Sequence, residues 1–235
     1  MATSSTYTVT KTAADLADSI MRVVATGGSP TSAEQADIIE AINFWLFQIQ
    51  EPPFVWKPGE FMWLRETADI TLSAKIAFDL KPSGGDCDIQ IPLEILTATL
   101  KDTSSNETPM STMSLQEFQA ISNKTNTGTP SRFYYERRRD TGKFYLDIIP
   151  SVTTDVVDIV YRQPMEVITA STQNFDLENY FFRALKYAVA VDIAPEFRVD
   201  AQTVRDLKEL KGEAMAVVSS IHPENTDAYF QPGID

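Results

Sequence analysis

The sequence predicts an α+β protein: an antiparallel helical bundle built from both chain ends, an inserted antiparallel β layer (meander or sandwich), and an extended C-terminal arm. Three observations predict this class. Hydrophobic residues recur at helical spacing near both ends of the chain, they alternate with period two in its middle, and all periodicity stops at Pro223. We expect a helical hairpin, a β-rich insertion with one short helix, a helical pair packing on the first hairpin, and the arm: residues 1–53, 54–168, 169–222 and 223–235.

Capping signals frame the first two helices. Thr12 and Asp15 have the spacing of a capping box, in which a hydroxyl and an acid three residues later satisfy backbone amides at a helix start. Thr31 and Glu34 repeat this spacing before a second apolar stripe. A glycine pair is expected to end the first helix and a proline pair the second, so the two helices form an antiparallel hairpin.

The link from Phe54 to Trp63 is rich in aromatic residues, and two interpretations compete. Trp56 and Trp63 could form a platform on which a sugar or a base stacks. Rings that neighbour prolines and a glycine are more often buried, and here they would wedge a loop between two layers.

Two stretches of the β region lead to opposite expectations. Residues 70–80 alternate apolar and polar side chains without interruption, which predicts one strand with one buried face. Residues 101–112 are rich in threonine and serine and are expected to form an exposed excursion between elements.

The stretch from Ser114 to Pro164 combines a short helix with three strands. Ser114 and Glu117 form another capping box. Period-two or β-branched runs follow at residues 132–138, 143–149 and 155–162. A tight turn at Asp140-Thr141-Gly142, with the glycine at positive φ, would join the first two strands, and together these strands predict a β-meander.

Two more helices are expected after Pro164. Asp176 can cap the third long helix and Pro195 closes it, while Asp200 can cap the fourth. Gly212 lies inside the fourth helix, where glycine costs about 1 kcal/mol relative to alanine. We therefore expect it to mark a close helix contact.

Composition limits the functional classes. Twenty basic and thirty-three acidic residues give a net charge of −13, which opposes tight binding to nucleic-acid phosphates. A single cysteine excludes a disulfide framework and multi-cysteine zinc sites. The sequence has no signal-peptide pattern and no bilayer-spanning apolar run, so we expect synthesis in the cytoplasm and no membrane association.

Catalytic, cofactor and metal motifs are incomplete. The only histidine, His222, falls at the end of the last helix, and Cys87 has no basic neighbour to lower its pKa. A calcium-loop match fails at Ile91 and a phosphate-loop match at Arg137, because each occupies a glycine position. A glycosidase-type carboxylate pair stays open only because so many acids are present. We expect no enzyme activity, no cofactor and no metal site.

These elements resemble the adaptor proteins of short-tailed bacteriophages (podoviruses), also called tail tubular or packaged-DNA stabilisation proteins. The central residues of the resemblance are Lys124, Gly128, Pro130, Phe133, Tyr134, Tyr135, Gly142, Phe144, Leu146, Pro150, Tyr161 and Pro164. Its N-terminal residues are Gly27, Gly28, Pro30, Glu34, Ile42 and Asn43.

The resemblance implies a structural virion protein at the head-to-tail junction. Such adaptors form a ring, typically a dodecamer, beneath the portal protein and offer a platform to the tail nozzle or tail tubular protein. They help to retain the packaged genome, and DNA passes through the channel at ejection without specific binding. The alternatives are a carbohydrate-binding module or glycoside hydrolase-like tail protein, and another neck completion protein.

Two groups of residues are candidates for partner binding. Arg137, Arg138 and Arg139 form the one basic patch, which either keeps a sheet edge soluble or pairs with acids of a neighbouring subunit or of the portal. Tyr229, Phe230 and Ile234 are apolar residues that a purely solvated tail tends to lack. The resemblance implies that they anchor the C-terminal arm on the portal or on a neighbouring subunit, and the alternative is a tail that is merely packed.

Overall fold

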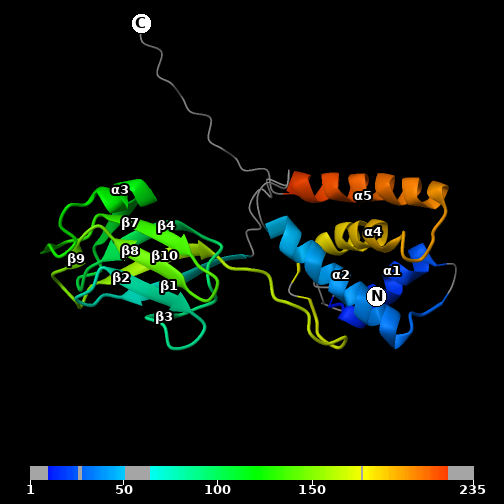
Figure 1. Ribbon diagram of the computed structural model, residues 1–235, viewed down its shortest axis with the longest axis horizontal. Coiled ribbons are helices and arrows are strands. Elements are labelled where there is room, and N and C mark those ends of the chain that lie inside the picture. Colours follow the sequence, from blue (N-terminus) through cyan, green and yellow to red (C-terminus); the bar gives the residue numbers. More distant parts are fainter. Residues whose placement is uncertain (1–9, 26–27, 51–63, 176, 222–235) are drawn as a thin grey trace, which may run out of the picture. The chain divides into compact units, whose positions relative to one another are not determined.

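The computed structural model describes residues 10–25, 28–50, 64–175 and 177–221. The chain divides into two compact units, Met62–Pro164 (the β unit) and Met1–Phe61 with Met165–Asp235 (the helical unit). The strands lie in one unit and all long helices in the other, which confirms the α+β class (Figure 1). The expected arm, residues 223–235, lies outside the described residues. None of the described helices has the length and apolar character needed to cross a membrane.

The described part of the helical unit contains four helices: α1 (Ala13–Val24), α2 (Ser32–Gln50), α4 (Phe181–Ile193) and α5 (Ala201–Ile221). The helix α4 contacts each of the other three. Its sequence explains this position, because Phe181, Leu185 and Val189 recur at helical spacing and are all fully buried.

The predicted caps of α1, α2 and α5 are confirmed. In α1 the Asp15 amide donates to the Thr12 hydroxyl at 3.1 Å, and the Asp15 carboxylate accepts from the Thr12 amide. Thr31 and Glu34 repeat the arrangement at α2. At α5 the Asp200 carboxylate accepts from the Thr203 amide at 3.0 Å.

Two expectations for the C-terminal helices are wrong. The helix α4 begins at Phe181 after an N-cap, Tyr180, whose side chain makes no capping hydrogen bond. The proposed cap, Asp176, lies outside the described residues. Gly212 marks no close contact either, because a Cβ built there meets nothing within 4 Å.

Eight strands of the β unit form one sheet in the order β1-β10-β4-β5-β7-β8-β2-β3. Their bounds are Arg65–Thr71 (β1), Ala77–Lys81 (β2), Cys87–Asp88 (β3), Glu94–Lys101 (β4), Glu107–Thr112 (β5), Arg132–Arg137 (β7), Gly142–Leu146 (β8) and Val156–Arg162 (β10). The end strands β1 and β3 contact each other, so the sheet nearly closes on itself. A short helix, α3 (Leu115–Ala120), and a two-stranded pair, β6 (Thr127–Gly128) with β9 (Ile149–Pro150), complete the unit.

A hydrophobic core fills the inside of the curled sheet. Alternate residues of the strands point inward, as the period of two requires. Phe78, Phe133 and Phe144 are at most 1% exposed, and the last two rings stack with centroids 5.3 Å apart.

The alternating run at residues 70–80 proves to be two strands, not one. The chain leaves the sheet between Thr71 and Ala77, so that β1 pairs with β10 and β2 pairs with β8. Residues 101–112 are also not an excursion. They contain the β4–β5 turn and all of β5, in which only Met110 is buried.

The predicted β-meander is wrong as well. The strands β7 and β8 form the expected hairpin, but β10 pairs with β4 and β1. Gly142 does not adopt a positive φ. Its small size matters for a different reason, since a Cβ there would lie 2.7 Å from the Tyr135 hydroxyl oxygen, and that hydroxyl donates to the Pro92 carbonyl.

Candidate functional site

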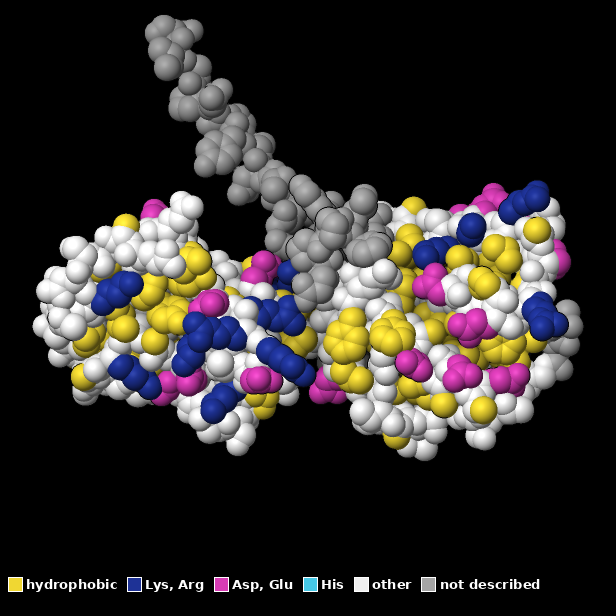
Figure 2. Space-filling view, in the orientation of Figure 1, with side chains coloured by type: hydrophobic (Ala, Val, Ile, Leu, Met, Phe, Trp, Pro, Cys, Tyr) yellow, Lys and Arg dark blue, Asp and Glu magenta, His cyan; other side chains and the backbone are white. Residues whose placement is uncertain are grey.

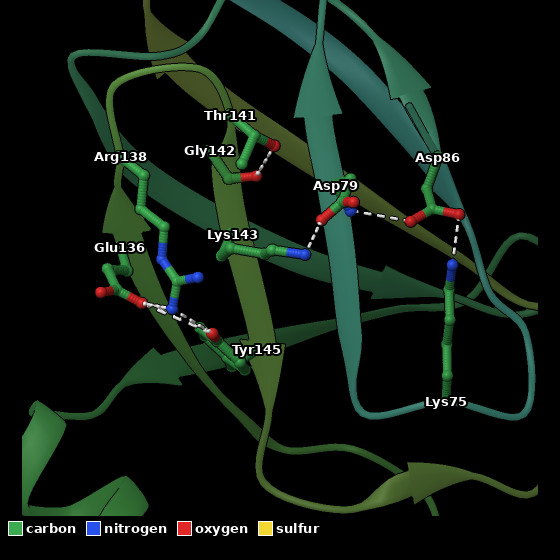
Figure 3. A network of polar contacts seen from close by, with 9 residues as sticks. All are labelled: Lys75, Asp79, Asp86, Glu136, Arg138, Thr141, Gly142, Lys143 and Tyr145. Carbon is green, nitrogen blue, oxygen red and sulfur yellow. Dashed lines mark hydrogen bonds and ion pairs between the residues drawn. The ribbon is translucent and has the colours of Figure 1, made fainter. Parts of the chain in front are cut away.

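The outer face of the β7–β8 hairpin carries a ladder of polar and aromatic side chains. The register places Tyr134 opposite Tyr145 and Glu136 opposite Lys143. On the other side of β8, Lys143 lies opposite Asp79 of β2 and forms an ion pair with it (Figure 3). The alternation of the strands therefore gives this face both rings and charges.

An aromatic cluster lies at the α3 end of this face. The Phe118 ring of α3 has its centroid 4.8 Å from that of Tyr145 and 6.0 Å from that of Tyr134. The Lys124 ammonium lies 4.5 Å from the Phe118 centroid, which is a cation–π distance. All three rings are half-buried, so the cluster holds α3 on the sheet and leaves part of its aromatic surface exposed.

The three candidate arginines lie at the turn of this hairpin. Arg137 ends β7, and Arg138 and Arg139 begin the turn, with all three exposed. Arg138 donates to Glu136 at 2.7 Å and to the Tyr145 hydroxyl at 3.1 Å. The hydrogen bond from Arg138 to the Glu136 carboxylate is the main cause that lowers the pKa of this carboxyl group.

A carboxylate network continues this face beyond β2. Asp86 accepts from the Asp79 amide at 2.7 Å and forms an ion pair with Lys75 (Figure 3). Partial burial raises the pKa of Asp86, but the hydrogen bonds from Lys75 and from the Asp79 amide outweigh it. The pKa therefore lies below its usual value of 3.8.

Asp86→Asn is expected to destabilise the β unit by about 0.5–1 kcal/mol at pH 7, because a screened ion pair is lost. A lowered pKa in the folded state contributes stability above the unfolded-state value, and this contribution disappears as pH falls through the folded-state value. The difference in melting temperature between the variant and the original chain should therefore shrink from pH 7 towards pH 2. Asp140→Asn, in the exposed hairpin turn, is the matched control and should change little at either pH.

The described residues offer little for metal or thiol chemistry. They contain no group of three or more His, Cys, Asp or Glu residues that could hold a metal ion. Burial raises the pKa of the Cys87 thiol, and the charges of Asp88, Asp69 and Asp86 raise it further. Cys87 therefore carries a protonated thiol and not a reactive thiolate.

Six other residues named from the sequence lie outside the described part of the chain. They are Trp56, Trp63, His222, Tyr229, Phe230 and Ile234.

Sequence reasoning missed a basic hollow in the helical unit. A hollow of about 360 Å³ lies between the start of α1 and one face of α4. Its lining includes the cations Lys11, Arg183 and Lys186 and the rings of Phe182 and Tyr187. Arg183 and Lys186 are one helical turn apart, which was a visible signal, but only folding brings Lys11 to them.

Comparison with known proteins identifies the family of this chain. A family model described as SU10 adaptor protein matches residues 11–220, which extends from the segment before α1 to the last turn of α5. No curated protein matches the chain. The match covers most of both units and confirms the resemblance to phage head-to-tail adaptors. The chain therefore belongs to the SU10 adaptor protein family, a family of phage structural proteins.

Proposed function

We propose that this chain is the adaptor of a short-tailed phage, which forms a ring that joins the portal protein to the tail and helps to retain the packaged DNA. The family match over residues 11–220 is the observation that carries this proposal. The proposed ring lies at the head-to-tail junction of the virion, and the resemblance to short-tailed phage adaptors favours a dodecamer. The adaptor acts through its surfaces and has no catalytic role.

The charge distribution supports a conduit through which DNA slides. The β unit has 11 basic and 14 acidic residues, whereas the rest of the chain has 9 basic and 19 acidic residues. A surface without excess cations releases few counterions from DNA and therefore binds it weakly. Such a channel wall lets the genome leave when the tail opens.

Light scattering of the purified protein, alone and with the portal protein of the same phage, tests the proposal. We expect a complex whose mass equals that of the portal plus one ring of adaptors. A chain that never associates with the portal would contradict the proposed function.

The arginine turn is proposed as one contact of this assembly, because bidentate arginine pairs fix the register of partners. Reversal of Arg137, Arg138 and Arg139 to glutamate should weaken portal-dependent assembly at least tenfold, measured by light scattering. Reversal of Arg205, Lys208 and Lys211 on α5 changes the net charge equally and is the control. Equal effects of the two triple variants would assign the loss to general repulsion and would remove the arginine turn from the interface.

The C-terminal arm is proposed as a second contact, with Tyr229, Phe230 and Ile234 as its apolar anchors. Apolar residues in an otherwise polar tail favour docking because their burial is the main source of binding energy for an extended segment.

A further inference from the structure

One side of α2 presents acidic and aromatic residues in a continuous stripe. Asp37, Glu40, Phe44 and Phe47 (the α2 stripe) follow each other at spacings of three, four and three residues, so they lie within about 80° of helical arc. The Phe44 and Phe47 side chains are 64% and 48% exposed. Figure 2 shows hydrophobic and acidic side chains next to each other over this helix.

The α2 stripe has no partner of opposite charge within the described part of its own copy. The helix contains no lysine or arginine, and no ion pair joins Asp37 or Glu40 to a described cation. The opposite face of α2, with Ile38, Ile42 and Trp45, is the buried face. Two exposed rings together on one helix face are typical of a protein interface.

The basic hollow has the complementary chemistry. Its three cations, Lys11, Arg183 and Lys186, lie beside the rings of Phe182 and Tyr187. The Arg183 and Lys186 cations are 5.9 Å and 5.6 Å from the Tyr187 centroid.

The positive charge of the hollow is only partly neutralised. Burial lowers the pKa of Lys186, and the charges of Lys11 and Arg22 lower it further. The ion pair of Arg183 with Glu213 is 3.5 Å long, and both side chains are more than half exposed. At the other edge, hydrogen bonds from Thr12 lower the pKa of Asp15, and the Lys11 charge lowers it further. A carboxylate of another molecule would therefore be attracted to the three cations of the hollow.

We propose that the α2 stripe of one copy docks on the basic hollow of the next copy. Its acids face the cations of the hollow, and its exposed rings extend the apolar contact. A second copy of this chain is the occupant because the matching surface is part of the chain itself. The hollow accommodates side chains rather than a nucleic-acid duplex, and the net charge of −13 opposes such a duplex.

The proposed contact joins two different surfaces, so it is heterologous. Repetition of a heterologous contact closes into a ring when the rotation allows it. This inference rests on the proposed function, because it supplies the contact between neighbours in the ring.

Opposite charge reversals test the contact. Lys11→Glu/Lys186→Glu (the reversed hollow) and Asp37→Lys/Glu40→Lys (the reversed stripe) should each weaken self-association at least tenfold, measured by sedimentation of the full chain alone and on the portal. The α5 variants Arg205→Glu/Lys208→Glu and Asp206→Lys/Glu209→Lys change the net charge equally and serve as controls. Circular dichroism and melting temperature establish that each variant is folded.

A mixture of the reversed hollow and the reversed stripe gives a more specific test. In each variant alone, the two contact surfaces carry the same sign of charge and repel each other. In a one-to-one mixture in which the two variants alternate, every contact joins surfaces of opposite charge. We therefore expect the mixture to assemble within about threefold of the original affinity and to contain equal numbers of both variants.

The outcomes separate this inference from the function on which it rests. Rings that tolerate both reversals, or a mixture that stays dissociated, would overturn the proposed contact and leave the adaptor function intact. Variants that form rings but lose the portal would reassign the hollow to the portal and also overturn it. An original chain that neither self-associates nor binds the portal would contradict the adaptor function itself.

Discussion

Replacing Phe144 by alanine is expected to destabilise the β unit by about 3–5 kcal/mol, the usual cost of removing a fully buried phenylalanine. The Phe144 side chain has no exposed surface and stacks on Phe133. Its register neighbours are Phe78 on β2 and Tyr135 on β7, so a strand flanks the residue on each side. The alanine variant therefore leaves a cavity between side chains of neighbouring strands.

Urea unfolding combined with hydrogen exchange measures this loss, and peptides from residues 62–164 should report it. Tyr145→Ala, on the outer face of the same strand, is the matched control and should cost about 1 kcal/mol, since it removes half-exposed ring contacts. Phe144→Leu retains most of the volume and should cost less than about 1.5 kcal/mol. Equal losses of stability in Phe144→Ala and Tyr145→Ala would show that the Phe144 side chain does not face the core.

Local signals in the sequence predicted local structure well. The capping boxes at Thr12, Thr31 and Ser114 form as expected, because each depends only on residues three positions apart. The strand around Phe144 was equally visible, since β8 alternates buried and half-buried side chains along its whole length.

Strand pairing was not predictable in the same way. The alternation from Ile70 to Leu80 continues across the break between β1 and β2, because Leu72 is buried although it has left the sheet. The strand β5 buries only Met110, so its period of two does not appear in the sequence. The position of β10 between β1 and β4 depends on contacts between distant residues, which no short window contains.

Contacts between residues distant in the sequence also limited the prediction of the candidate surfaces. The arginine turn was found because its residues are consecutive, but its pairing with Glu136 and Tyr145 depends on the hairpin register. The basic hollow combines Lys11 with residues of α4, far along the chain, and this combination exists only after the helices pack. The α2 stripe could have been found from its spacing, since its acidic and aromatic residues share one face of a predicted helix.

Gln50→Leu is expected to destabilise the helical unit by about 1–3 kcal/mol, although leucine is the more apolar residue. Gln50 is only 7% exposed, and its amide accepts from the Met165 backbone N–H at 2.8 Å and donates to the Leu46 carbonyl at 2.8 Å. Leucine offers no acceptor, so the buried N–H of Met165 would lose its partner. Amide hydrogen exchange at Met165, together with urea unfolding, measures both effects, and Gln48→Leu on the exposed side of α2 should stay within about 0.5 kcal/mol.

Asn43 extends this prediction to a pair of residues that hold the same segment. Its amide donates to the Ile168 carbonyl at 2.8 Å and accepts from the Ile168 N–H at 3.0 Å. Because Asn43 and Gln50 both fix the chain at 165–168 to α2, loss of one frees part of what the other holds. The double variant with Asn43→Leu should therefore cost less than the sum of the two single variants, by about 0.5 kcal/mol or more. Strict additivity would show that the two amides act on the segment independently, and unchanged exchange at Met165 in Gln50→Leu would show that the N–H finds another acceptor.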